Sequence, residues 1–329
     1  MKKKLFIVNL RAIALIAVVI IHVSAPFLVL DDPQNNLIWN FGNLIDSSFR
    51  FGVPIFLMIS GYLIFSKEYS SISNFLVKRL KKIILPLAFW TIIFSLVRLK
   101  SGDDLLLIVK LLRTGVFYHF WYVYMIIGIY LFFPILNSWV NKASKRQLEY
   151  FISIWFISCL ISSYNLEGFF LNLDILSFSG YMGYTVLGFY LGNFVKKGNY
   201  SLIFYLLGAL ITIFGTRYLS IIDNQYNELF YNYLSPNVIL MSIGVFGLFV
   251  NLNLKNKRVQ LMLSEISDYS FGIYFCHPLI LLVLSKMKID YMSFGPVFGF
   301  LITTILCILL SYILIYVLRK ITILKEYVG

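Results

Sequence analysis

Charged residues are scarce in this sequence of 329 residues, since Asp, Glu, Lys and Arg together make up only 13% of it. Soluble globular domains carry about 25% charged and about 45–50% apolar residues. Here 60% of the residues are hydrophobic and the mean hydropathy is +0.83. A water-soluble fold could not hide this much apolar surface, because charged side chains must cover its outside. The composition excludes soluble, disordered and collagen-like proteins and predicts an integral membrane protein.

Cysteine is also scarce, and its three residues all lie inside apolar runs: Cys159, Cys276 and Cys307. An odd number of cysteines in such runs indicates neither a disulfide framework nor a zinc site. The sequence has no P-loop, no glycine-rich dinucleotide motif and no H-E-x-x-H metal motif. Any chemistry must therefore depend on polar residues inside the hydrophobic runs or at their ends.

We interpret ten hydrophobic runs as membrane spans, since a helix crosses the hydrocarbon layer with about 20 apolar residues. We therefore expect an all-α polytopic protein, multi-pass in the cell membrane, with residues 1–329 forming a single transmembrane domain. The first run carries Arg11 and continues to residue 30, which favours a retained span over a cleaved signal peptide. The short run 104–112 predicts an interfacial helix. The predicted spans are 6–30, 45–65, 83–99, 118–137, 151–165, 178–195, 201–216, 234–251, 269–285 and 296–318.

Basic residues are concentrated in alternate connections between these runs. Ten spans place 19 of the 28 Lys and Arg residues on one side with five acidic residues, and seven on the other side with ten. The positive-inside rule assigns the basic side, and with it both termini, to the cytoplasm. We interpret the net charge of +13 as a consequence of membrane topology, and not as a sign of nucleic-acid binding. The basic residues are also expected to contact membrane lipids. The basic segments are 1–5, 66–82, 141–150, 196–199, 252–268 and 319–329.

Arg11 and His22 share the first run and are eleven residues apart. This spacing is about three helical turns, so both side chains project from one face at heights about 16 Å apart. An ionisable residue inside a span is costly and indicates a functional site by default. The alternatives are that Arg11 reaches to the inner interface and that His22 bonds to a neighbouring helix.

The other two histidines lie in aromatic or proline-containing sequence. His119 and Trp121 belong to an aromatic cluster that is typical of an interfacial belt. His277 follows Tyr274 and directly precedes Pro278, which removes a main-chain hydrogen bond from the helix. A nearby His or Tyr can satisfy the affected carbonyl, so a structural role for His277 stands beside a catalytic one.

The second run combines helix-breaking, small and charged residues. Pro54 inside the membrane predicts a kink or a broken helix. The pair Ser60-Gly61 favours close approach of another helix, or alternatively of a ligand. Arg50 follows Asp46 by four residues, so it either bridges to Asp46 across one helical turn or contacts substrate.

Four cations stand at the start of the third run: Lys78, Arg79, Lys81 and Lys82. Topology and contact with anionic lipids explain many clusters of this kind. The alternative is a binding site for the phosphates of a nucleotide-bearing donor such as coenzyme A (CoA).

Together these segments resemble the membrane-bound acyltransferase-three family. The match is spread over residues 9–278, and the paired Arg and His of the first run are its most specific element. Some relatives carry an additional hydrolase-like domain, so this chain resembles the stand-alone type and is similar to the acyltransferases of bacterial exopolysaccharide and capsule clusters. The segments that carry the resemblance are Asn9-Leu10-Arg11 with His22, Pro54 to Tyr62, Lys78-Arg79 to Pro86, Phe120-Trp121-Tyr122 with Tyr130 and Pro134, and Ser270 to Tyr274 with His277-Pro278.

The resemblance implies an O-acyltransferase that uses acyl-CoA, usually acetyl-CoA, as its donor substrate and holds no bound cofactor or metal. The acceptor is expected to be a hydroxyl of a cell-surface polysaccharide or of its lipid-linked precursor, with the polysaccharide synthesis machinery as a candidate partner. We expect His22 to be the general base, or alternatively to carry a transient acyl group, with Arg11 as the second catalytic residue. Contacts to donor and substrate are expected from Lys78, Arg79, Lys81, Lys82, Ser60, Arg50, His119, Trp121, Tyr274 and His277.

A polysaccharide flippase or polymerase-type transporter is the competing interpretation of the same residues. Such a protein also needs many spans, and embedded Arg and His residues would line its transport path. It would not consume an acyl donor, so CoA-dependent turnover separates the two classes. A sensor or receptor is a third class, for which the sequence offers no dedicated ligand-binding domain.

Overall fold

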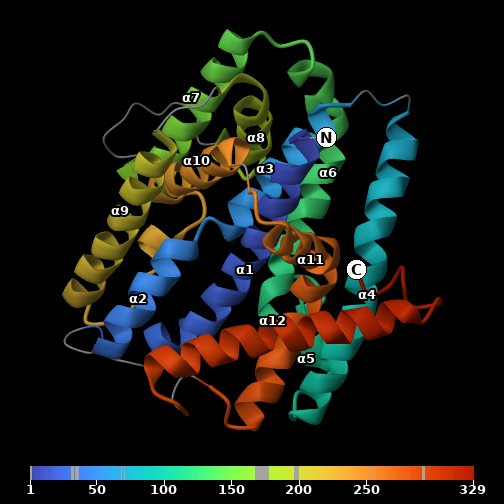
Figure 1. Ribbon diagram of the computed structural model, residues 1–329, viewed down its shortest axis with the longest axis vertical. Coiled ribbons are helices and arrows are strands. Elements are labelled where there is room, and N and C mark those ends of the chain that lie inside the picture. Colours follow the sequence, from blue (N-terminus) through green and yellow to red (C-terminus); the bar gives the residue numbers. More distant parts are fainter. Residues whose placement is uncertain are drawn as a thin grey trace. The chain divides into compact units, whose positions relative to one another are not determined.

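The computed structural model describes residues 2–30, 33, 37–67, 69, 71–166, 178–195, 200–252, 254–290 and 293–329. Helices and the turns between them account for these residues, and no strand occurs among them. The chain forms two compact units. Figure 1 shows the helices along the chain. The first unit comprises Met1–Lys67 and Ser138–Ser267, and the second comprises Glu68–Asn137 and Asp268–Gly329.

Each unit is a set of packed helices. The first unit contains α1 (Lys2–Leu30), α2 (Leu37–Phe49), α3 (Gly52–Phe65), α7 (Lys145–Ser163), α8 (Met182–Phe194), α9 (Tyr200–Ile222), the short 3-10 helix η4 (Leu229–Tyr231), α10 (Pro236–Asn251) and the start of α11 (Lys257–Lys286). The second unit contains α4 (Ile72–Lys100), α5 (Leu105–Leu111), the short 3-10 helix η1 (Tyr118–Phe120), most of α6 (Trp121–Val140), the remainder of α11, and α12 (Pro296–Lys320).

Local sequence signals mark where several of these helices begin. The Asp104 side chain accepts a hydrogen bond from a main-chain amide in the first turn of α5. Ser144 and Gln147 form a reciprocal capping box at the start of α7. Pro236 and Pro296 occupy the first positions of α10 and α12, where a main-chain amide would have no hydrogen-bond acceptor within the helix. These helices therefore start where their sequences satisfy or remove the unpaired amides.

Every predicted span contains a helix, but eight helical segments of the described part are long and apolar enough to cross a membrane. The 13 residues of α8 extend about 20 Å, which is less than the hydrocarbon thickness. The first turns of α7 carry charged residues, which shortens its apolar stretch. The chain is a multi-pass membrane protein, while the number ten and the cytoplasmic termini stay predictions. The side chains of residues 2–4, and Lys196 and Lys197, lie outside the described residues.

The second predicted span consists of two helices, as the sequence around Pro54 suggested. Helix α2 ends at Phe49, and α3 begins at Gly52. Pro54 is the third residue of α3, in the first turn, where its missing amide costs no hydrogen bond. The predicted start of this span at residue 45 was wrong, because α2 begins at Leu37 and includes polar residues whose side chains are buried inside the protein. In the run 104–112, the predicted short helix is present as α5.

Helices α3 and α8 pack backbone against backbone in the first unit. A Cβ added at Gly61 would lie 1.9 Å from the Thr185 carbonyl oxygen, and one at Gly188 would lie 2.1 Å from the Met58 carbonyl oxygen. Only glycine permits such an approach, as in other membrane helix pairs that meet through small residues. The close-packing interpretation of Gly61 is therefore confirmed.

Aromatic side chains hold the second unit together. The ring of Phe94 on α4 stacks on Phe117 at 4.5 Å and meets the edge of Phe120 at 5.5 Å. Phe120 in turn contacts Phe275 of α11 at 5.8 Å. The Trp90 indole donates a hydrogen bond of 3.3 Å to a main-chain carbonyl near the end of the chain. Segments far apart in the sequence thus meet around α4.

We predict that Gly61→Ala or Gly188→Ala destabilises the protein by about 1–3 kcal/mol or more, because the added methyl group meets main-chain atoms that cannot rotate away. The measurement is the thermal unfolding midpoint of the purified protein in detergent. Gly128→Ala on α6 is the matched control, since no atom lies within 4 Å of its added Cβ. Its stability should stay equal or rise slightly. Equal midpoints for all three variants would contradict the packing argument.

Candidate functional site

Arg11 and His22 lie on one face of α1, as their spacing predicted. Helix α1 is continuous through both positions, and both side chains are half-buried. Their immediate neighbours along the helix are fully buried, among them Leu10, Ala12 and Ile21. The two ionisable groups therefore lie on the less covered face of a helix that is otherwise enclosed.

The turn that follows His22 is weaker than the rest of α1. Pro26 lies inside the helix and cannot donate the usual main-chain hydrogen bond to the His22 carbonyl. The hydroxyl of Ser24 is 3.1 Å from the Ile21 carbonyl oxygen and 3.1 Å from Oδ2 of Asp46 on α2. A side chain from another helix thus supports this turn.

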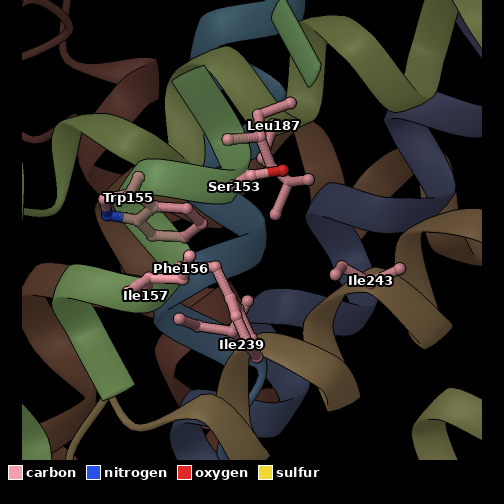
Figure 2. A pocket seen from close by; sticks show the side chains of 8 residues that line it. Ser153, Trp155, Phe156, Ile157, Leu187, Ile239 and Ile243 are labelled. Carbon is pink, nitrogen blue, oxygen red and sulfur yellow. The ribbon is translucent and has the colours of Figure 1, made fainter. Parts of the chain in front are cut away.

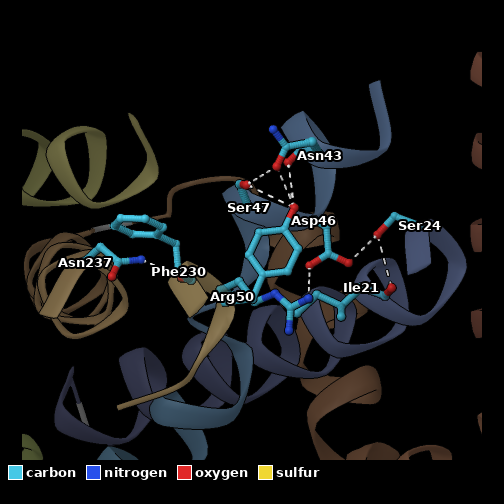
Figure 3. Close-up of polar contacts among 9 residues, drawn as sticks. Ile21, Ser24, Asn43, Asp46, Ser47, Arg50, Phe230 and Asn237 are labelled. Atoms are coloured by element: carbon cyan, nitrogen blue, oxygen red, sulfur yellow. Dashed lines mark hydrogen bonds and ion pairs between the residues drawn. The ribbon is translucent and has the colours of Figure 1, made fainter. Parts of the chain in front are cut away.

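Asp46 forms a buried ion pair with Arg50, which is the bridge that their spacing suggested. The two side chains meet at 2.5 Å, and Asp46 is fully buried while Arg50 is 13% exposed (Figure 3). The Arg50 guanidinium also lies over the ring of Tyr231, 4.0 Å from its centre. A buried carboxylate is tolerated when a cation and hydrogen-bond donors surround it, and Arg50 and Ser24 meet that need.

The same face of α2 carries two further polar side chains, Asn43 and Ser47. The Tyr231 hydroxyl donates to Oδ1 of Asn43 at 2.6 Å, and the Ser47 hydroxyl lies 3.0 Å from the same oxygen (Figure 3). The Asn43 amide donates to the Ile213 carbonyl of α9 at 2.9 Å. Helix α2 is therefore tied to α1, α9 and η4 by side-chain hydrogen bonds, and to η4 also by the contact of Arg50 with the Tyr231 ring.

Tyr226 adds a neutral phenol beside this cluster. It lies in the connection between α9 and η4, with its ring 5.8 Å from that of Tyr231. Burial raises the pKa of Tyr226 well above its ordinary value, although the positive charge of Arg50 acts in the opposite direction. The phenol therefore stays protonated at every physiological pH.

Ser60 lies on α3, beside the close contact with α8. Its hydroxyl donates to the Phe56 carbonyl of its own helix at 2.9 Å. The side chain is half-buried, and the neighbouring Gly61 serves helix packing. Contact of Ser60 with substrate stays a prediction.

His119, Tyr274 and His277 come together in the second unit. The two imidazole rings are 5.6 Å apart, and the Tyr274 ring is 5.5 Å from that of His119. The Tyr274 hydroxyl donates to the His119 main-chain carbonyl. Trp121 begins α6 directly after this cluster and is half-buried.

Both imidazoles donate to main-chain carbonyls. Nδ1 of His277 lies 2.7 Å from the Tyr274 carbonyl oxygen, to which Pro278 cannot donate. Nε2 of His119 lies 3.2 Å from the Phe275 carbonyl oxygen. A carbonyl only accepts, so each of these nitrogens carries a hydrogen. The two rings are 1% and 0% exposed, so the structural role weighed for His277 is the one that these contacts support.

The four cations at the start of α4 are in the second unit. Lys78, Lys81 and Lys82 are exposed, whereas Arg79 is half-buried. Lys81 pairs with Glu326 at 2.9 Å, and both side chains are more than half exposed. The remaining three cations extend over little more than one helical turn, which suits a phosphate-bearing ligand as well as lipid headgroups.

A cavity of about 360 Å³ opens between α7, α8 and α10, and it is apolar (Figure 2). Its single hydroxyl, that of Ser153, donates to the Glu149 carbonyl of its own helix. None of the predicted site residues lines it, so we do not assign the chemistry to this cavity. The lining residues are Ile152, Ser153, Trp155, Phe156, Ile157, Leu187, Ile239 and Ile243.

The sequence comparisons decide the family to which these residues belong. The acyltransferase-three family model, described as "Acyltransferase domain", matches residues 5–316. The chain belongs to the acyltransferase-three family. It is also similar to a curated protein of Bacillus subtilis (strain 168) named "Putative membrane-bound acyltransferase YfiQ", with 24% identity over 309 residues that cover 85% of this chain and 81% of that protein. No solved structure matches the chain.

Sequence reasoning did not connect Ser24, Asn43 or Tyr231 with the site. A signal for Asn43 was present, since Asn43, Asp46, Ser47 and Arg50 follow the spacing of one helical face. The partners from α1 and η4 carry no comparable signal, because they are brought to α2 only by folding.

We predict that Arg50→Met destabilises the protein by about 3–5 kcal/mol, because it leaves the Asp46 carboxylate buried without its cation. Asp46→Asn should destabilise the protein similarly, because it leaves the Arg50 guanidinium without its carboxylate partner. The double variant Asp46→Asn/Arg50→Met should lose less stability than the sum of the two single variants. Unfolding midpoints of the four proteins measure this coupling. Strict additivity would show that the ion pair contributes nothing to the fold.

Proposed function

We propose that this membrane acyltransferase moves an acyl group, first of all acetyl, from cytoplasmic acyl-CoA to a hydroxyl of a cell-surface polysaccharide or of its lipid-linked precursor. Family membership supports acyl transfer over the flippase alternative. The observation that carries the assignment of the base is the burial of the three histidines. His22 is half-buried on the face it shares with Arg11, whereas His119 and His277 are enclosed and donate to main-chain carbonyls.

The proposed reaction needs a base at the acceptor. His22 in its neutral form takes the proton from the acceptor hydroxyl as the oxygen attacks the thioester carbonyl. The new ester bond forms as the carbon–sulfur bond breaks, and the departing thiolate of CoA receives the proton that His22 took from the hydroxyl, which returns His22 to its neutral form. Arg11 lies about 16 Å below His22 along α1, a separation that suits contact with the phosphate or pantetheine part of the donor. A transient acyl-His22 is the alternative route.

The donor side of the proposal rests on charge. Lys78, Arg79 and Lys82 offer three cations at the start of α4, and the excess of basic residues on that side favours the cytoplasm. The acyl donor is made in the cytoplasm, so a phosphate site there is consistent with the proposed direction of transfer. The same distribution of charge supports cytoplasmic termini.

We expect His22→Ala to lower acyl transfer by about 10²–10⁴-fold, the usual contribution of a general base. The measurement is thioester loss from acetyl-CoA and succinyl-CoA by the purified protein in detergent, with the unfolding midpoint as the control for folding. Full turnover in folded His22→Ala would refute the assignment of the base. A folded wild-type protein that neither binds nor consumes acyl-CoA would favour the flippase.

We also expect Lys78→Gln/Arg79→Gln/Lys82→Gln to raise KM for acetyl-CoA by about tenfold, because exposed cation–phosphate contacts are individually weak. The turnover number at saturating donor should change little. Lys257→Gln/Arg258→Gln at the start of α11 is the matched control and should leave KM unchanged. An unchanged KM in the triple variant would contradict donor binding by this cluster. Its role would then be limited to membrane topology and contact with lipids.

A further inference from the structure

The outer turn of α1 is held to α2 by one side-chain hydrogen bond, from Ser24 to Asp46. The distance from the Ser24 hydroxyl to Oδ2 of Asp46 is 3.1 Å, and both residues are fully buried. The hydroxyl has a single hydrogen, and the carboxylate is a stronger acceptor than the Ile21 carbonyl, which lies at the same distance. The bond to Asp46 is therefore the one that fixes this side chain.

This turn needs outside support because α1 does not hold it fully. Pro26 cannot donate to the His22 carbonyl, so one main-chain hydrogen bond of the helix is missing at the residue that is the proposed base. Helices bend or loosen at such positions. The direction in which His22 points consequently depends on what holds residues 22–26 from outside the helix.

Asp46 is a rigid point for this attachment. Its other carboxylate oxygen meets Arg50 at 2.5 Å, and the Arg50 guanidinium is fixed in turn over the Tyr231 ring at 4.0 Å. Asp46 and Arg50 lie one turn apart on α2, so the carboxylate cannot move without separating a buried ion pair.

We propose that Ser24 and Asp46 are positioning residues for His22. They do not touch the substrate; their hydrogen bond fixes the proline-weakened turn and thereby the direction of the imidazole toward the acceptor hydroxyl. The inference rests on the proposed function, in which His22 is the base, and it adds the device that orients that base. A misplacement of a base by about 1 Å can cost on the order of a hundredfold in rate.

Ser24→Ala tests this with the smallest change, since it removes the hydroxyl and leaves the Asp46–Arg50 pair intact. We expect kcat to fall about tenfold or more with KM for acetyl-CoA within twofold of wild type. Ser24→Thr keeps the hydroxyl and should restore most of kcat. Ser158→Ala is the matched control, because Ser158 is also fully buried and donates to a carbonyl of its own helix, α7.

Two outcomes would overturn the inference. One is a wild-type kcat in Ser24→Ala, and the other is an equal loss of kcat in Ser158→Ala, which would mark a general effect of removing a buried hydroxyl. His22→Ala, measured in the same assay, separates the two proposals. If His22→Ala is inactive and Ser24→Ala is fully active, the positioning role alone fails. If His22→Ala is fully active, the proposed function fails.

Discussion

A carboxylate removed from water needs a cation and hydrogen-bond donors at contact distance, and much of the first unit is arranged to supply them to Asp46. Arg50 provides the charge from the next turn of α2, and Ser24 donates from α1. Tyr231 covers the guanidinium and donates to Asn43. Three segments that are distant in sequence therefore share one electrostatic requirement, and none of them can shift without exposing an ion to apolar surroundings.

Polar contacts around Asp46 hold α1, α2 and η4 together in the first unit. Helices α3 and α8 are held together by close packing of their backbones. Gly61 and Gly188 let α3 and α8 meet backbone to backbone, where neither a hydrogen bond nor a charge is needed. Lipid does not drive helices together as water does, so intimate contact of this kind supplies the attraction. The helix break between α2 and α3 permits both kinds of contact, because α2 can pack within the polar network while α3 packs against α8.

Local spacing explains what the sequence could predict. The shared face of Arg11 and His22, the Asp46–Arg50 bridge and the break near Pro54 each follow from helix geometry over at most about three turns. Contacts such as that of Tyr231 with Asn43, 188 positions apart, depend on folding and leave no periodic trace. The predicted run 178–195 overestimated the length of α8 (Met182–Phe194) for a related reason, since hydrophobicity indicates burial but does not say whether protein or lipid buries the helix.

Burial also separates the two kinds of ionisable residue that the sequence could not distinguish. His119 and His277 each give a ring hydrogen to a main-chain carbonyl, and both side chains are enclosed by protein, so the rings stabilise the backbone around them and are closed to a ligand. Such groups serve the fold because every polar atom in a membrane interior must be satisfied from within. A group that serves chemistry must remain accessible to a ligand, and the half-buried face of α1 with His22 and Arg11 meets that condition. In our proposal the orientation of His22 is fixed through Ser24, which is hydrogen-bonded to the buried pair of Asp46 and Arg50.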